Sequence, residues 1–176
     1  MALIAALLAV LALASSGALA ASWEADTVTG VMEQPTSHYY HLIFGASVQG
    51  GTTSEGFLVK GTYWQRPTFE AAGYADQDEG WWGMVGTKVT KEKDRGLYAY
   101  AGFGRVGGWV KDLSQGSKST YLVNGPVFDV EYALHFGHFS MAVGHQQFIG
   151  YVSKFQVDAY VAWPYSFYTI NLGATL

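Results

Sequence analysis

Histidine has the widest chemical repertoire among the residues of this sequence, since it can act as a metal ligand, a general base or a proton donor. The five histidines are scattered along the chain: His38, His41, His135, His138 and His145. No two of them stand at a spacing typical of a zinc site with a carboxylate nearby. His135 and His138 merely flank a short turn. We therefore expect no metal site and no bound cofactor.

Two further patterns contain residue types that bind ions or phosphate. Asp76, Asp78 and Glu79 could offer oxygen ligands to calcium, although a solvated acidic loop is the favoured interpretation. The glycine-rich segment 102–108 superficially matches a phosphate-binding loop. Such a loop is followed by a Lys-Ser/Thr pair and a helix, and the sequence supplies neither. Neither pattern predicts a binding site.

His145 is a weak candidate for a catalytic residue because of the surface on which we expect it to lie. It has the same parity as Phe139 and Val143, so these side chains point to one side of a β-strand. An imidazole on a lipid-facing side is costly and for that reason often functional. However, Gln147 offers no nucleophile two residues on, and Asp158 has the parity of the opposite face. The favoured alternative places His145 near the end of its strand, at the level of the lipid headgroups, or beyond a bulge.

The elements that must position these residues are β-strands, because apolar residues recur at every second position. The alternation is clearest in three segments: Phe128–Phe136, Phe155–Trp163 and Phe167–Leu176. Weaker or glycine-broken strands fill much of the rest: Tyr39–Gln49, Phe57–Gln65, Phe69–Asp76, Trp81–Thr90, Leu97–Val106 and Phe139–Gln147. Trp23–Met32 is ambiguous between a short amphipathic helix and a further strand. Gly, Pro and Ser clusters between the segments mark turns.

Composition limits what these strands can build. The chain of 176 residues is 49% hydrophobic, 16% aromatic and 14% charged, and it contains no cysteine. A net charge of −4 without a basic cluster gives no reason to expect nucleic acid as a partner. After residue 20, no apolar run approaches the about 20 residues that a membrane helix needs. An apolar composition without a long apolar run is typical of proteins that cross a membrane with β-strands.

The first 20 residues are predicted to be a secretory signal peptide. A long apolar run is followed by small residues that end in Ala18-Leu19-Ala20. No Lys or Arg precedes that run, so an uncleaved anchor is the alternative. We expect cleavage after Ala20 and a single domain over residues 21–176.

We predict an all-β domain that forms a closed, antiparallel, up-and-down transmembrane β-barrel with its apolar face toward lipid. Eight strands fit the length, at about 20 residues for a strand and its loops; ten is the alternative. The expected lumen carries charges of both signs: Lys60, Lys88, Asp129, Glu131, Lys154 and Asp158. The expected interfacial aromatic residues lie near strand ends: Tyr39, Tyr40, Trp64, Trp81, Trp82, Trp109, Trp163, Tyr165 and Tyr168. A soluble periplasmic β-barrel binder, with its apolar face inward, is a further alternative.

Three segments resemble the hairpins of small bacterial outer-membrane barrels of the opacity and OmpX-like class: Tyr98–Gly104, Asp129–Leu134 and Phe139–Gly144. The apolar final strand, which ends on Leu176, resembles the C-terminal assembly signal of such barrels, which normally ends on Phe. The resemblance implies a non-enzymatic outer-membrane protein that serves envelope integrity, surface contact or a narrow pore. The partners it implies are membrane lipid, lipopolysaccharide and the barrel assembly machinery, while the oligomeric state stays open.

Two families of lipid A acyl-modifying enzymes share this barrel size and supply the alternative function. Trp23 and the segments 34–35, 38–39 and 96–99 are similar to the lipid A palmitoyltransferase family in matching order. That family's catalytic residues do not carry over, because 50–52 reads Gly-Gly-Thr and 104–106 reads Gly-Arg-Val at the corresponding places. The lipid A deacylase family places a His and a Ser two residues apart on a lipid-facing strand. In this sequence the residue two after the corresponding histidine is a glutamine.

Overall fold

The computed structural model describes residues 22–33, 40–52, 57–92, 94–152 and 162–175, and these residues form nine β-strands. Within these ranges no helix has the length and hydropathy needed to cross a bilayer. The strands are β1 (Ser22–Glu33), β2 (Tyr40–Thr52), β3 (Phe57–Gln65), β4 (Phe69–Ala71), β5 (Tyr74–Lys88), β6 (Arg95–Asp112), β7 (Lys118–Phe136), β8 (Phe139–Val152) and β9 (Ala162–Thr175).

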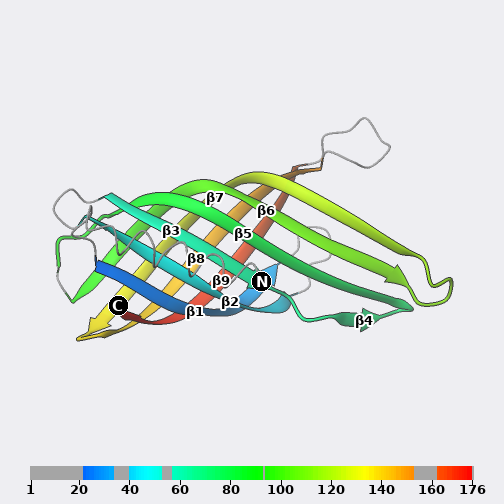
Figure 1. Ribbon diagram of the computed structural model, residues 1–176, viewed down its shortest axis with the longest axis horizontal. Helices are drawn as coiled ribbons and strands as arrows, with labels where there is room; N and C mark the ends of the chain where they lie inside the picture. The colour runs from blue at the N-terminus through cyan, green and yellow to red at the C-terminus, as the bar shows by residue number, and fades with distance from the viewer. Residues whose placement is uncertain (1–21, 34–39, 53–56, 93, 153–161, 176) are drawn as a thin grey trace.

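The sheet closes on itself into an antiparallel barrel (Figure 1). Its strand order is β3-β2-β1-β9-β8-β7-β6-β5-β4, and a further pairing between β3 and β5 completes the ring. The short β4 pairs only with the start of β5 and continues the line of β3 beyond Pro67. The Arg66 N–H donates to the Asp78 carbonyl at 2.8 Å, which keeps the ladder joined across that break. The barrel therefore has eight strand positions, as predicted.

The identity of the eight strands differs from the prediction at two places. Trp23–Met32 is a strand and not a helical turn, because β1 pairs along its length with both β2 and β9. Phe69–Asp76 is not one strand, because Ala72 and Gly73 turn the chain with φ angles of 52° and 84°. The predicted strand Phe155–Trp163 lies outside the described residues except for its last two positions, which belong to β9. The predicted signal peptide, residues 1–20, also lies outside them.

The two ends of the barrel differ. At one end, β7 and β8 are joined by the tight turn Gly137-His138, and β1 begins beside the end of β9. At the other end, β5 reaches as far as β6, since Tyr74 pairs with Asp112, and the β6–β7 hairpin stays paired up to Lys111 and Lys118, next to its connecting turn (Figure 1). We call residues 107–122, the outer part of this hairpin, the β6–β7 protrusion.

Candidate functional site

The lumen holds a buried ion cluster near the end with the tight turn. Lys60 on β3 extends its ammonium group between two carboxylates of β7, with Asp129 Oδ2 at 2.8 Å and Glu131 in direct contact. Asn171 Nδ2 donates to Glu131 at 2.7 Å, and Gln146 Nε2 donates to Asp129 at 3.2 Å. The predicted lumen residues Lys60, Asp129 and Glu131 are thus confirmed and brought together. Lys154 and Asp158 lie outside the described residues.

A second acidic pair lies on β1 beside this cluster. Ser47 Oγ donates to Asp26 Oδ2 at 3.2 Å, and Gln49 Nε2 donates to Glu24 Oε2 at 2.8 Å. Tyr100 then donates its hydroxyl hydrogen to Gln49 Oε1 at 2.8 Å. Because Tyr100 lies on β6 and Gln49 on β2, this network ties together strands that are not neighbours in the barrel.

Aromatic side chains close the middle of the lumen. Trp64, Phe148 and Phe167 have no measurable solvent exposure, and Trp82 is 2% exposed. Their rings are in mutual contact, with centroids 5.0 Å apart for Trp64–Phe167, 5.2 Å for Trp82–Phe167 and 6.1 Å for Trp82–Phe148. We call these four residues the aromatic plug. It fills the barrel interior, as side chains do in small barrels.

The prediction of interfacial aromatic residues is therefore wrong for Trp64, Trp82 and Tyr165, all of which are buried in the lumen. The reason is strand parity, because Trp64 shares the inward side of β3 with Lys60. Tyr40, Trp81 and Tyr168 point outward, since they are 65%, 54% and 46% exposed, and their place at a membrane interface stays a prediction. Their exposure places them on the outer surface of the barrel.

Beyond the plug, toward the protrusion, a second ion cluster fills the lumen. Arg66 donates from Nε to Asp78 Oδ2 at 2.9 Å and from Nη2 to Asp76 Oδ2 at 2.8 Å. Tyr121 on β7 donates its hydroxyl hydrogen to Asp78. His41 Nδ1 lies 3.5 Å from Arg66 Nη1. Asp76 and Asp78 thus lie on strand β5 and form ion pairs with Arg66, so the predicted solvated acidic loop is wrong.

We expect the plug to make the barrel impermeable to small solutes. Planar bilayers that contain the wild-type protein should show no conductance steps, whereas the double variant W82G/F148G should conduct, because two large rings leave the lumen. A matched variant with two outward changes, V85G/V143G, should stay closed. Steady ion conductance through the wild-type protein would contradict this expectation.

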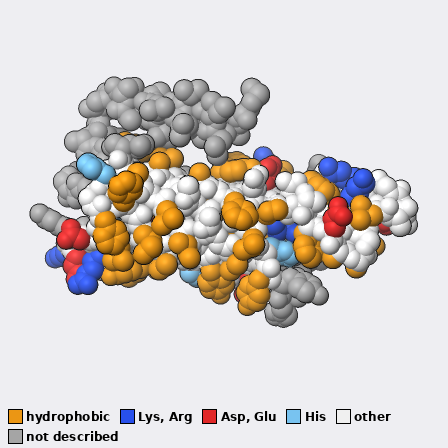
Figure 2. Space-filling model, turned by 90° about the horizontal axis from the view of Figure 1, so that it is seen from below, with side chains coloured by type: hydrophobic (Ala, Val, Ile, Leu, Met, Phe, Trp, Pro, Cys, Tyr) orange, Lys and Arg blue, Asp and Glu red, His pale blue; other side chains and the backbone are white. Residues whose placement is uncertain are grey.

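The outer surface of the barrel is apolar over its middle (Figure 2). Large hydrophobic side chains with exposures of 40% to 61% stand on six of the strands: Leu42, Phe44, Val85, Phe103, Phe128, Val130, Tyr132, Met141, Val143, Ile170 and Leu172. On β7 the outward side chains are apolar from Pro126 to Phe136. That stretch is about 34 Å long and, at a tilt of about 40°, about 26 Å tall. Its height matches the apolar band of a membrane barrel, about 25 Å.

Two outward threonines in this surface fit an environment without water. Thr27 and Thr29 are exposed on β1, and each hydroxyl donates to a backbone carbonyl of β9, at 3.2 Å to Leu172 and 3.1 Å to Ile170. A hydroxyl that already has a partner loses little when water is removed from around it. The polar atoms of this face are therefore compatible with an apolar surrounding.

His145 faces outward, on the side that its parity predicts. It is exposed at the seventh position of the 14-residue strand β8, so its expected place at a strand end is wrong. Its ring lies 4.9 Å from that of Tyr168, its partner in the register of β9. Gln147 follows on the same side, and Asp158 lies outside the described residues. The described neighbours give His145 an aromatic contact and no nucleophile.

The described part of the chain contains no group of three or more His, Asp or Glu residues arranged to hold a metal ion. His38 lies outside that part.

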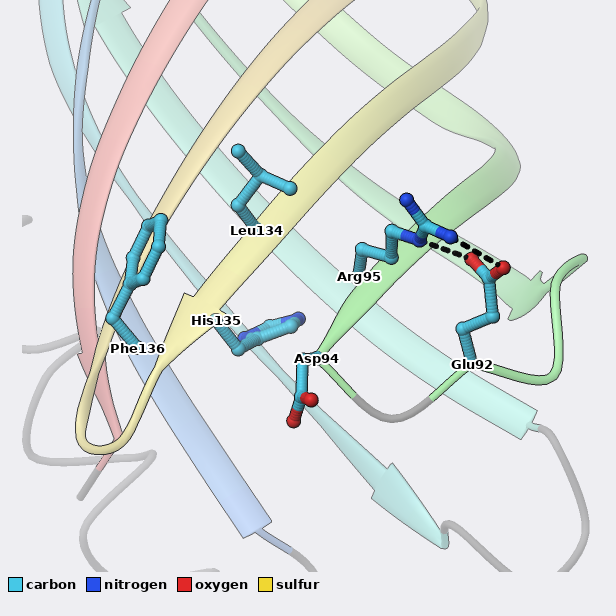
Figure 3. Close-up of a pocket in the computed structure, with 6 residues that line it drawn as sticks. All are labelled: Glu92, Asp94, Arg95, Leu134, His135 and Phe136. Carbon is cyan, nitrogen blue, oxygen red and sulfur yellow. Dashed lines mark hydrogen bonds and ion pairs between the residues drawn. The ribbon is translucent and has the colours of Figure 1, made fainter.

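His135 accepts or donates a hydrogen bond at Nε2 with the Tyr98 hydroxyl, at 3.0 Å. It also lines an open notch of about 700 Å³ at the end of the barrel with the tight turn, together with Glu92, Asp94, Arg95, Leu134 and Phe136 (Figure 3). In that notch Arg95 is already paired with Glu92, at 2.7 Å.

The turn at the tip of the β6–β7 protrusion is fixed by Asp112. Its carboxylate accepts hydrogen bonds from the Ser114 hydroxyl at 2.6 Å and from the backbone N–H groups of Ser114 and Gln115 at 2.8 and 3.1 Å. The hydrogen bond from the Ser114 side chain is the main reason that the pKa of Asp112 lies below its usual value, and the two backbone bonds add to it. Gly116, with a φ of 69°, then reverses the chain. The tip is ordered by local contacts.

No protein-family model and no curated protein sequence matches this chain. Solved structures do match it. The attachment invasion locus protein Ail of Yersinia pestis superimposes with a TM-score of 0.61 at 10% identity, over 89% of this chain and 97% of that one. Neisserial surface protein A gives a TM-score of 0.62 at 11% identity, with the same coverage of both chains. Identities this low show a shared fold, that of small eight-stranded outer-membrane barrels.

Proposed function

We propose that this protein is a non-enzymatic barrel of the bacterial outer membrane that serves contact at the cell surface. The observation that carries the proposal is the orientation of the strands, with large apolar side chains outward and buried ion pairs inward. A soluble barrel would bury its apolar face. In water the exposed apolar surface would be unfavourable over most of the barrel, whereas in a bilayer the same surface meets hydrocarbon.

Surface contact is favoured over a narrow pore by the aromatic plug, and over enzyme chemistry by the surroundings of His145. It is supported by the β6–β7 protrusion, which stays paired up to its connecting turn and carries exposed basic side chains, Lys111 and Lys118. Short turns face the periplasm in barrels of this type and longer loops face outward. By that rule the protrusion lies on the outer side of the cell.

Assembly of the barrel is expected to follow the usual route for this class. We propose that a cleaved signal peptide directs export and that the barrel assembly machinery inserts the chain. The alternating apolar strand β9, which pairs with β1 to close the barrel, would carry the assembly signal. Partition into the outer-membrane fraction, with faster migration of the unboiled protein than of the boiled protein, would support this part of the proposal.

Lysine labelling on intact cells tests the orientation. A membrane-impermeant amine reagent should modify Lys111 and Lys118 on whole cells, because both are exposed on the protrusion. Lys91 is also exposed but lies in the β5–β6 connection at the opposite end, so it should react only after the outer membrane is permeabilised. Mass spectrometry of the peptides measures the modification of Lys91 and of the two protrusion lysines. Reaction of Lys91 on intact cells, with the protrusion lysines protected, would overturn the proposed orientation.

A further inference from the structure

The outer face of β6 and β7 carries its basic side chains at two separate heights. Arg105 stands just above the apolar band, next to Asn124 of β7 and Trp81 of β5 in the register. Lys111 and Lys118 stand opposite each other near the tip of the protrusion. Six residues separate the two levels, which is about 20 Å along the strand and about 15 Å along the membrane normal at a tilt of about 40°.

Arg105, the basic side chain closer to the apolar band, has hydrogen-bond donors that are not in use. Arg105 is exposed and donates from Nε to Asn124 Oδ1 at 3.1 Å, and it forms no ion pair with any residue that the structure describes. The terminal nitrogens of its guanidinium group are thus available, in the geometry that binds a phosphate through two parallel hydrogen bonds. Glu79, an outward acid on the neighbouring strand β5, accepts a hydrogen bond from the Tyr63 hydroxyl at 3.1 Å. An arginine at the upper edge of an apolar band faces the layer of lipid phosphates.

Near the tip of the protrusion, two positively charged side chains stand side by side. Lys111 and Lys118 are direct cross-strand partners, and both are exposed. Like charges at such positions destabilise a hairpin unless an anion lies between them. The Lys118 ammonium group lies 4.4 Å from the centre of the Trp109 ring, and Trp109 Nε1 donates to Gln77 Oε1 at 3.2 Å, which fixes the ring. A fixed, partly exposed indole between two basic sites offers a flat surface on which a sugar ring can pack.

We propose that the outer face of β6 and β7 binds one molecule of lipopolysaccharide, with a lipid A phosphate on Arg105 and acidic groups of the inner sugars on Lys111 and Lys118. The separation between Arg105 and the two lysines along the membrane normal favours this ligand. A phospholipid carries its anionic group at one level only, whereas a glycolipid with charged core sugars continues its negative charge outward from the membrane. The acyl chains would lie against Phe103 and the neighbouring apolar side chains below Arg105. This site rests on the proposed outer-membrane location.

The test separates the two levels by using three lipids. The detergent-solubilised full-length protein is titrated with phosphatidylglycerol, with lipid A, and with lipopolysaccharide that retains its inner core, and the apparent affinity in mixed micelles is measured. We expect the affinity to increase in that order. Arg105→Gln should weaken the binding of lipid A and of lipopolysaccharide about tenfold, the usual effect of losing one charge-assisted contact. The double variant K111S/K118S should weaken lipopolysaccharide binding similarly and leave lipid A binding unchanged.

Lys91→Ser removes an exposed positive charge from the opposite end of the barrel and is the matched control, expected to bind all three lipids like the wild type. Equal affinities for the three lipids would overturn the proposed site, as would wild-type binding of lipid A by the Arg105 variant or of lipopolysaccharide by the double lysine variant. Failure of the outer-membrane proposal has a different signature, because the protein would then fold without detergent and remain in the soluble fraction of the cell.

Discussion

Replacement of Lys60 by methionine is expected to destabilise the barrel by about 3–5 kcal/mol, the cost of leaving buried charges without their partner. The Lys60 ammonium group is fully buried between Asp129 and Glu131, and the side chains of these residues are 0% and 3% exposed. Methionine has a similar length, so packing changes little while two carboxylates lose their counter-charge. The measurement is reversible urea unfolding of the protein in phospholipid vesicles, followed by tryptophan fluorescence.

The triple variant K60M/D129N/E131Q supplies the control for this prediction. It removes all three charges together and keeps side chains of nearly the same shape, so most of the lost stability should return. A single K60M variant that is as stable as the wild type would show that the cluster does not hold the barrel together. A triple variant as unstable as K60M would show that shape, and not charge, decides.

Replacement of Ile170 by arginine is expected to reduce the stability in a bilayer by about 2–4 kcal/mol, as for charged residues near the middle of the lipid-facing surface of other barrels. Ile170 is 51% exposed on β9 and lies beside the outward side chains of Val143 and Thr29. In water an exposed isoleucine could be exchanged for arginine at little cost. The size of the effect therefore reports whether the surrounding medium is lipid.

Leu113→Arg is the matched comparison for Ile170. Leu113 is 46% exposed, but it lies in the turn at the tip of the β6–β7 protrusion. Its replacement should change the stability by no more than about 0.5 kcal/mol, as is usual for surface positions. Equal effects of the two substitutions would contradict the assignment of the apolar surface to lipid. The comparison uses the same vesicles and the same unfolding measurement as for Lys60.

The period-two alternation predicted the outward and inward sides of most strands correctly. Val130 and Ile170 on one parity, and Asp129 and Glu131 on the other, lie as expected, because successive side chains of a strand alternate whatever the neighbouring strands are. The same reasoning failed where a local signal is weak. Trp23–Met32 alternates polar with apolar residues on both faces, and only its pairing with β2 and β9 makes it a strand.

For the residues of the buried ion cluster, the sequence predicted the side of the strand but not the contacts. The sequence predicted that Lys60, Asp129 and Glu131 line the lumen, but not that they touch, because Lys60 is 69 and 71 residues away from its two partners. Contact across the lumen depends on the register of every strand between β3 and β7 and on closure of the ring. The two levels of basic side chains on the outer face of β6 and β7 also depend on the register, which sets Lys111 against Lys118 and Arg105 against Asn124.

The order of residues along the chain was thus enough to predict strands with an apolar and a polar face, since the two-residue repeat of a strand is a local property of the backbone. Which inward residues meet depends on the folded barrel. The parity of β3 turns Trp64 inward with Lys60, although its place near a strand end had indicated an interfacial position, and only the closed ring brings it against Phe167. This is because the interior of a small barrel is filled by contacts between distant strands, and their partners are fixed only when the last hydrogen-bonded pair closes the sheet.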